Sequence, residues 1–294
     1  MLSVLVCSVN PVFLQQFQRN VEETIGIPYE VIVFDNREEK KGICEVYNTL
    51  ATRSVYDHLC FVHEDVVFTT YNWGQQLFKT FHDEKAGLIG VAGSKYKSAM
   101  YSGWFTGIKQ YDCANIIHRY KDGEEHIFLQ PDADVSIENV VTIDGVFMAC
   151  RKEVWQQVQF DQENIRGFHL YDLDFSLRAA FKTRVVVDYN ILLVHITSGG
   201  NYSDDWMKAS IAFHRRYPNL PFPEKTSGVT EDDIKIARTN LDFLKKYRIS
   251  WQYKMQWIKF QGLYKYNTLY YSLIKFLLYQ PLQMKKVHHF LKSK

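Results

Sequence analysis

Three short stretches of this chain bring together side chains that could bind a metal ion or move a proton. Glu64 and Asp65 come directly after the apolar run His58–His63. Tyr-Asp-Leu-Asp at 171–174 begins a segment with helical spacing, and His195 ends the apolar run 191–194. Carboxylate and imidazole groups are the usual metal ligands and general bases of enzymes. Each stretch also has an ordinary structural explanation.

A carboxylate that follows a buried strand can hold Mg²⁺ or Mn²⁺ together with the oxygens of a diphosphate. The cation would then neutralise charge on a departing nucleoside diphosphate. Glu64 and Asp65 fit that description, but two solvated acids at a strand end are the alternative. For His195, which follows apolar residues, the alternative to a metal role is a buried, hydrogen-bonded histidine.

The acids at the start of the helical segment also have two interpretations. Asp172 could accept a proton from an attacking hydroxyl group. Alternatively, Asp172 stabilises the helix N-terminus, and Asp174 pairs with Arg178 four residues later.

Several other chemistries are excluded by missing motifs. The chain has no GxSxG elbow, no HExxH pair, no Cys/His spacing of a zinc site, and no GxGxxG after its first strand. A serine hydrolase, a zinc site and a dinucleotide fold are therefore disfavoured.

The elements that must position these residues alternate between strand and helix over the first 95 residues. Apolar runs at 2–9, 29–34, 58–63 and 87–92 predict strands, and the spacing at 11–25, 43–55 and 73–81 predicts helices. Asn10-Pro11 is a favourable helix start. This alternation predicts a parallel sheet with helices on both faces. Polar residues end the first three strands, which predicts a ligand site at that edge of the sheet.

The remainder is predicted to be mixed and then helical. A hairpin is expected around 116–129, a short helix at 151–158, and strands at 140–143, 184–187 and 191–194. Residues 204–294 have helical patterns. We expect a catalytic domain over 1–220 and a helical, basic, aromatic region over 221–294.

Charge divides the chain unequally. Its net charge is +2, but eleven Lys/Arg and no acid lie from Lys245 onward, so residues 1–244 carry 24 basic and 33 acidic side chains. This acidic body is not suited to nucleic acid. The five cysteines form no CxxC pair and predict reduced thiols, as is typical of the cytoplasm. No signal peptide or membrane span is expected.

Taken in order, these features resemble family 2 glycosyltransferases of the GT-A fold, and within them the streptomycin-biosynthesis StrF-type branch. The matching segments are residues 33–36 (VFDN), 41–48, 61–66 (FVHEDV), 143–147 (IDGVF), 167–175 (GFHLYDLDF) and 194–195 (VH). The resemblance covers about residues 1–200. It implies an α/β fold with a nucleotide-binding, Rossmann-like mixed sheet flanked by helices.

The resemblance also implies roles for individual residues. Asp65 and His195 would bind Mn²⁺ or Mg²⁺, with His63 in place of the first Asp of the usual motif. Asp172 would be the general base and Asp174 would support it. The remaining roles are nucleotide-sugar binding by Ser8, Asp35, Lys41, Glu64 and Asp65, and a sugar or acceptor pocket formed by Trp104 and Asp144. Such enzymes usually invert configuration, and the acceptor would be a glycan or lipid-linked glycan.

Two other functions remain open: a catalytically silent nucleotide-sugar-binding module, and a membrane-surface adaptor that acts through the basic tail. Between 263 and 277, apolar side chains recur on one helical face beside Lys265 and Lys275. This face would lie on an anionic membrane, at the inner side of the cytoplasmic membrane. Alternatively, it packs on the catalytic domain or mediates homo-oligomers.

Overall fold

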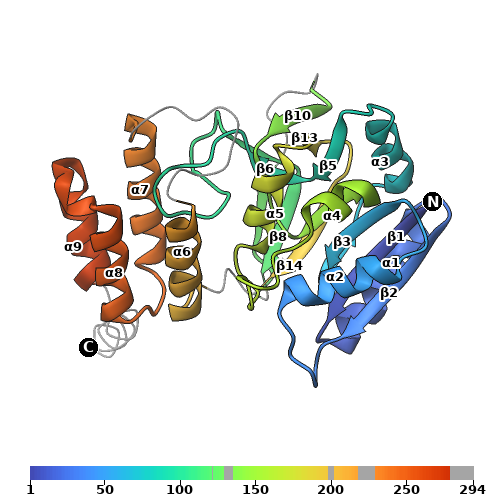
Figure 1. The fold of residues 1–294 in the computed structure, drawn as a ribbon, viewed down its shortest axis with the longest axis horizontal. Helices are drawn as coiled ribbons and strands as arrows, with labels where there is room; N and C mark the ends of the chain where they lie inside the picture. Colours follow the sequence, from blue (N-terminus) through green and yellow to red (C-terminus); the bar gives the residue numbers. More distant parts are fainter. Residues whose placement is uncertain (121, 129–134, 198–201, 218–228, 279–294) are drawn as a thin grey trace. The chain divides into compact units, whose positions relative to one another are not determined.

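The computed structural model describes residues 1–120, 122–128, 135–197, 202–217 and 229–278 (Figure 1). The chain forms two compact units. The first comprises Met1–Lys97 and the described part of Lys109–Gly199. The second comprises Ser98–Ile108 and the described parts of 200–220 and 225–294. The expected domain boundary near residue 220 stays a prediction.

A mixed sheet forms the centre of the first unit. Its strand order is β10-β13-β5-β12-β3-β1-β2. In chain order the bounds are β1 (Leu2–Ser8), β2 (Tyr29–Asp35), β3 (His58–His63), β5 (Ala86–Gly90), β10 (Ile137–Val140), β12 (Phe147–Arg151) and β13 (Arg184–Asp188). The predicted mixed α/β fold is confirmed. β1 runs parallel to both β2 and β3.

The strands predicted over the first 95 residues, β1, β2, β3 and β5, run in the same direction, as expected, and the sheet is mixed because of β10 at its edge and, in its interior, β12. This strand lies between β3 and β5 and is antiparallel to both. The run 147–151 is short and buried, and no local turn signal shows which partners it pairs with. Its insertion brings the preceding turn, Asp144–Val146, next to the end of β3, where the His63 amide donates to the Val146 carbonyl at 3.2 Å.

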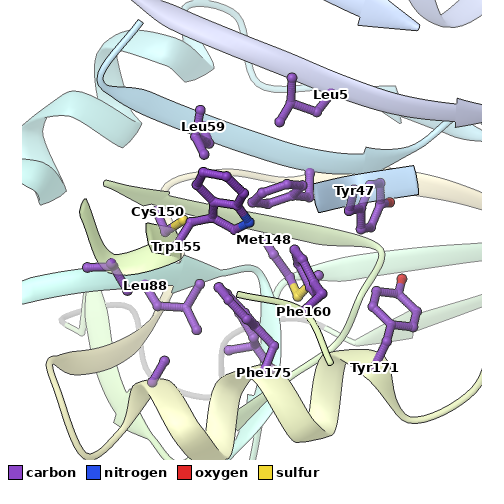
Figure 2. Packing of buried hydrophobic residues seen from close by; sticks show 14 of the residues in the cluster. Leu5, Tyr47, Leu59, Leu88, Met148, Cys150, Trp155, Phe160, Tyr171 and Phe175 are labelled. Atoms are coloured by element: carbon purple, nitrogen blue, oxygen red, sulfur yellow. The ribbon is translucent and has the colours of Figure 1, made fainter. Parts of the chain in front are cut away.

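Helices cover both faces of this sheet: α1 (Pro11–Thr24), α2 (Ile43–Arg53), α3 (Trp73–Phe81), α4 (Lys152–Val158) and α5 (Tyr171–Ala179). As predicted, α1 begins after Asn10, whose side chain accepts hydrogen bonds from the Val12 and Phe13 amides. Residues of α2, α4 and α5 share one buried core with the sheet. Figure 2 shows Trp155, Phe160 and Phe175 packed among strand residues of that core.

Two smaller sheets extend the first unit. One has the order β11-β6-β7 and the other β4-β14-β8-β9. Their bounds are β4 (Val66–Phe68), β6 (Ala92–Ser94), β7 (Asp112–Ala114), β8 (Ile116–Tyr120), β9 (Glu125–Phe128), β11 (Thr142–Ile143) and β14 (Leu193–Thr197). The expected hairpin is therefore confirmed as β8 and β9, while β4, β7 and β12 were not predicted. All five cysteines are free thiols.

The second unit is helical, as expected. It contains α6 (Asp204–Arg216), α7 (Glu231–Leu244), α8 (Trp251–Gln261), the 3₁₀ turns η1 (Leu263–Lys265) and η2 (Asn267–Leu269), and α9 (Tyr270–Leu278). Trp206, Leu241, Trp257 and Phe276 belong to its own buried core. None of the described helices is long and apolar enough to cross a membrane.

The apolar face expected to lie on a membrane is divided by this fold. Leu263, Leu269 and Leu273 are buried in the core of the second unit, because α8 and α9 pack on neighbouring helices. These three residues therefore pack within the second unit itself, and packing of this region on the catalytic domain or on a second copy stays a prediction. Tyr270 and Ile274 remain exposed. The prolines at 218–223 and 281 lie outside the described residues.

Candidate active site

The polar ends of the first three strands meet at one edge of the sheet, as the sequence predicted. In the strand register, Ser8 pairs with Asp35 and Cys7 pairs with His63. The Glu64 carboxylate accepts hydrogen bonds from the Ser8 hydroxyl at 2.6 Å and from the amides of Val9 and Asn10 at 2.9 Å. Glu64 thus holds the turn from β1 to α1. Direct contact of Ser8 and Glu64 with a nucleotide-sugar stays a prediction.

The two residues expected to contact the nucleotide from β2 and its loop are on the surface. Asp35 pairs with the Arg37 guanidinium, and this hydrogen bond lowers the pKa of Asp35 to about 2. The Lys41 ammonium lies 3.1 Å from Glu39 and 2.9 Å from Glu45. Neither arrangement tests nucleotide binding, so these two roles stay predictions.

The backbone brings Asp65 and His195 together. β4 begins directly after Asp65 and pairs antiparallel with β14, placing His195 opposite Val66. The His195 Nε2 atom lies 3.3 Å from Asp65 Oδ1, and His63 Nδ1 lies 3.9 Å from the same oxygen. One donor atom from each of the three side chains lies within 4.8 Å of the others. His63 therefore joins the two predicted ligands: it ends β3, and the turn formed by Glu64 and Asp65 follows it directly.

The chemistry of this cluster fits a divalent cation. His195 Nδ1 is buried without a hydrogen-bond partner within the described residues, and Asp65 Oδ1, also buried, faces the two histidines. Burial lowers the pKa of His63 below 6.5, which keeps that imidazole neutral, the form that binds a metal. Burial alone would lower the pKa of His195 as well, but the Asp65 carboxylate raises it above 6.5. A cation would replace the proton shared in this way.

Asp172 lies at the start of α5 and bonds to the turn that precedes β12. Its Oδ2 accepts from the Gly145 amide at 3.0 Å, and its Oδ1 accepts from the Leu173 amide at 2.8 Å. Burial, followed by the charge of Asp144, raises the pKa of Asp172 to about 7 despite these two hydrogen bonds. A carboxyl group that titrates near neutral pH is suited to accept a proton from a hydroxyl.

The aromatic residue beside Asp172 connects it to the histidine cluster. The Tyr171 hydroxyl lies 2.9 Å from His63 Nε2 and donates to the Gly145 carbonyl at 3.1 Å. A cavity of about 180 Å³ is lined by residues of β1, α2, the end of β3 and the start of α5, among them Cys7, Tyr47, His63, Asp65 and Tyr171. The sequence did not indicate Tyr171; its place directly before the expected base was the available signal.

His118 was also missed. It lies on β8 in register with His195 on the parallel strand β14, and the two rings are 5.3 Å apart. This pairing joins residues 77 positions apart in the chain, so no local pattern could indicate it.

Asp174, an expected site residue, has other partners in the first unit. Asp174 is buried and pairs with Arg178 at i,i+4, with an Nε–Oδ2 distance of 2.8 Å. Arg178 also donates to the carbonyls of Val158 and Gln159. The helix ion pair that the sequence suggested for Asp174 is therefore present, and a supporting role of Asp174 in catalysis stays a prediction. Trp104 belongs to the second unit, so its role in a pocket with Asp144 stays a prediction.

The fold has counterparts among solved structures. S. aureus TarS 1–349 is similar over 94% of this chain and 81% of its own, with 12% identity and a TM-score of 0.55. The same protein in complex with UDP-GlcNAc matches over 88% and 78%, with 13% identity and a TM-score of 0.53. GalNAc-T7 with UDP, GalNAc and Mn²⁺ matches over 72% of this chain, with 10% identity and a TM-score of 0.50. The match spans about half of that enzyme, 47% of its chain.

At these identities the similarity establishes the fold alone, which is that of GT-A glycosyltransferases. No curated protein is significantly similar in sequence. The narrower resemblance to the StrF-type branch stays a prediction. The model of the glycosyltransferase-like family, however, matches residues 3–214, which include every residue of the cluster described above. The chain belongs to the glycosyltransferase-like family.

Proposed function

We propose that the first unit is the catalytic domain of a metal-dependent glycosyltransferase. It moves a sugar from a nucleotide-sugar to an acceptor hydroxyl with inversion of configuration. One observation carries this proposal: three side chains that could hold a cation and a carboxyl group with a pKa of about 7 are joined through Tyr171 and Gly145. The nucleotide-sugar in the TarS structure and the Mn²⁺ in the GalNAc-T7 structure support it.

In the proposed reaction, Asp172 takes the proton of the acceptor hydroxyl as its oxygen forms a bond to the anomeric carbon. The bond from that carbon to the nucleoside diphosphate breaks at the same time, and its electron pair leaves with the diphosphate. A bound cation supplies positive charge that stabilises this leaving group. Because the two oxygens occupy opposite sides of the anomeric carbon, a single displacement inverts its configuration.

His63, Asp65 and His195 would hold the cation. Two imidazoles and one carboxylate suit Mn²⁺ better than Mg²⁺, since Mg²⁺ prefers oxygen ligands and retains water. We therefore expect Mn²⁺ to bind more tightly than Mg²⁺ in calorimetry. Asp65→Ala should abolish Mn²⁺-dependent binding of the nucleotide-sugar without loss of the fold. A variant that binds both as well as the parent would show that Asp65 is not a ligand.

Release of the nucleoside diphosphate distinguishes an active glycosyltransferase from a catalytically silent nucleotide-sugar-binding module. The parent protein with Mn²⁺ and a panel of nucleotide-sugars should release nucleoside diphosphate, slowly to water and faster with a glycan or lipid-linked acceptor. Asp172→Asn should bind the same donor and release almost none. Donor binding without release by the parent, over the full panel, would favour the silent module.

A further inference from the structure

We propose that Tyr171 is a positioning residue that fixes the tautomer of His63 and so presents the Nδ1 atom of that ring as a metal ligand. This inference rests on the proposed cation site. It assigns to Tyr171 a function that neither the sequence pattern nor the family match assigns. It also explains how a histidine can stand where related motifs have an aspartate.

The hydrogen bonds around the Tyr171 hydroxyl permit one assignment that satisfies every group. The Gly145 carbonyl can only accept, so the single hydroxyl hydrogen of Tyr171 is directed to it at 3.1 Å. The hydroxyl oxygen then accepts from His63, whose Nε2 lies 2.9 Å away. His63 must therefore carry its hydrogen on Nε2, which leaves a lone pair on Nδ1.

That lone pair belongs to the nitrogen nearer the other ligands. His63 Nδ1 lies 3.9 Å from Asp65 Oδ1, which in turn lies 3.3 Å from His195 Nε2. A histidine that binds a metal through one nitrogen usually donates the hydrogen of the other to a fixed acceptor. Tyr171 is that acceptor for His63.

Tyr171 is itself held in place. Its side chain is 5% exposed, and its ring packs against Tyr47 and Phe160 at centroid distances of 5.8 and 6.2 Å. Gly145 completes the arrangement, because a Cβ at that position would overlap the Tyr171 hydroxyl. Leu170, at φ +64°, turns the chain into α5 immediately before Tyr171. The left-handed conformation is unfavourable for leucine, and such strain is concentrated at functional sites.

The first test measures the tautomer in the metal-free parent protein. Two-bond ¹H–¹⁵N correlation spectra at pH 7.5 report which nitrogen of His63 is protonated, and His63→Gln identifies its signals. We expect the Nε2–H form alone in the parent and a mixture of both tautomers in Tyr171→Phe. An Nδ1–H form in the parent would overturn the proposal even if no variant folds.

The second test measures Mn²⁺ affinity by calorimetry. Loss of a group that orients a metal ligand typically weakens binding by about 10–100-fold, and we expect this of Tyr171→Phe. Tyr189→Phe is the matched control: it also removes the hydroxyl of a buried tyrosine of the first unit, but one that interacts with Cys113 and does not line the cavity beside His63. Its Mn²⁺ affinity should equal that of the parent.

A failure of the Tyr171 proposal can be distinguished from a failure of the proposed metal-dependent function. If Tyr171→Phe folds, as shown by near-UV circular dichroism, and keeps both the parent tautomer and the parent affinity, Tyr171 has no positioning role and the cation site stands. If the parent binds no Mn²⁺ at all, the proposed metal-dependent function fails instead. A combined His63→Gln, Tyr171→Phe variant should lose no more affinity than His63→Gln, because Tyr171 acts through His63.

Discussion

The Gly145 amide donates to Asp172 Oδ2 at 3.0 Å, across 27 residues of chain. The carbonyl of the same glycine accepts from Tyr171, which contacts His63. One residue of the turn before β12 thus contacts both the carboxyl group that would take a proton and the tyrosine beside the cation site. The position of this turn depends on the antiparallel pairing of β12 with β3.

The pH dependence of transfer should reflect the environment of Asp172. Its pKa is raised to about 7 by burial and then by the charge of Asp144, and the base must be ionised. With saturating Mn²⁺, kcat/KM should therefore fall as the pH decreases below about 7. In Asp144→Asn the nearby charge is gone, so the pKa of Asp172 should decrease and the acidic limb of the pH profile should move to lower pH. Burial should still keep this pKa above its ordinary value. If the acidic limb of the pH profile does not move in this variant, the charge of Asp144 does not raise the pKa of Asp172.

Asp172→Asn should separate activity from stability. The folded-state pKa is raised above the ordinary value of 3.8, so the folded protein binds this proton more tightly than the unfolded chain does. The free energy of unfolding of the parent therefore falls as the pH rises from about 4 to about 7. Asparagine cannot ionise and avoids this penalty, which amounts to a few kcal/mol at about 1.4 kcal/mol for each pKa unit.

We expect Asp172→Asn to melt at a higher temperature than the parent at pH 8, with the difference vanishing near pH 4. Its kcat should fall about 10²–10⁴-fold with little change in donor affinity. Lower stability at every pH would instead show that the carboxylate is needed mainly to hold Gly145 and the helix start.

Gly145→Ala should disturb Tyr171 and Asp172 together. The added Cβ would overlap the Tyr171 hydroxyl, and overpacking of a buried region costs about 1–3 kcal/mol. Turnover should fall with stability, because both side chains must move. Gly167→Ala is the control, since a Cβ there meets no atom within 4 Å. Thermal melts and initial rates of both variants test this prediction. Equal melting temperatures and equal rates for the two variants would show that the turn accommodates the added Cβ without disturbing Tyr171 or Asp172.

Membrane association through the tail stays a prediction. Because part of the predicted apolar face is buried, the exposed residues of α9 would now make the contact. In α9, Tyr270, Tyr271 and Leu278 are 60%, 77% and 72% exposed, and no acid occurs after Asp242. The chain after Asp242 carries basic charges and no acidic ones, so it would be attracted to anionic lipid, at about 1 kcal/mol per engaged Lys or Arg. The full chain should co-sediment with phosphatidylglycerol vesicles, less so in high salt.

Replacing one of these apolar side chains with an acid tests the same surface. Tyr271→Glu should weaken sedimentation with the anionic vesicles, whereas Val55→Glu, at a 71% exposed site of the first unit, should not. Equal sedimentation with phosphatidylcholine vesicles, or none at low salt, would contradict the membrane role and favour oligomerisation.

The sequence alone determined the elements whose signals are local. The Asn10-Pro11 start of α1, the strand His58–His63 and the helix that begins at Tyr171 were each predicted, and the structure has them there. The sequence also indicated the pairing of Asp174 with Arg178, because side chains four residues apart are neighbours on a helix. Asp65 and His195 were named as metal ligands because of the resemblance to family 2 glycosyltransferases, and this role stays a prediction.

Only the tertiary structure decided how distant residues combine. β12 enters the sheet between strands that precede it by about 60 and 90 residues, and no periodicity encodes such pairing. The contact of Tyr171 with His63 spans 108 residues. The raised pKa of Asp172 depends on burial and on Asp144, neither of which follows from its neighbours in the chain. Residue types and local spacing specify which groups are present, but the strand pairing and helix packing of the folded chain determine which of them meet.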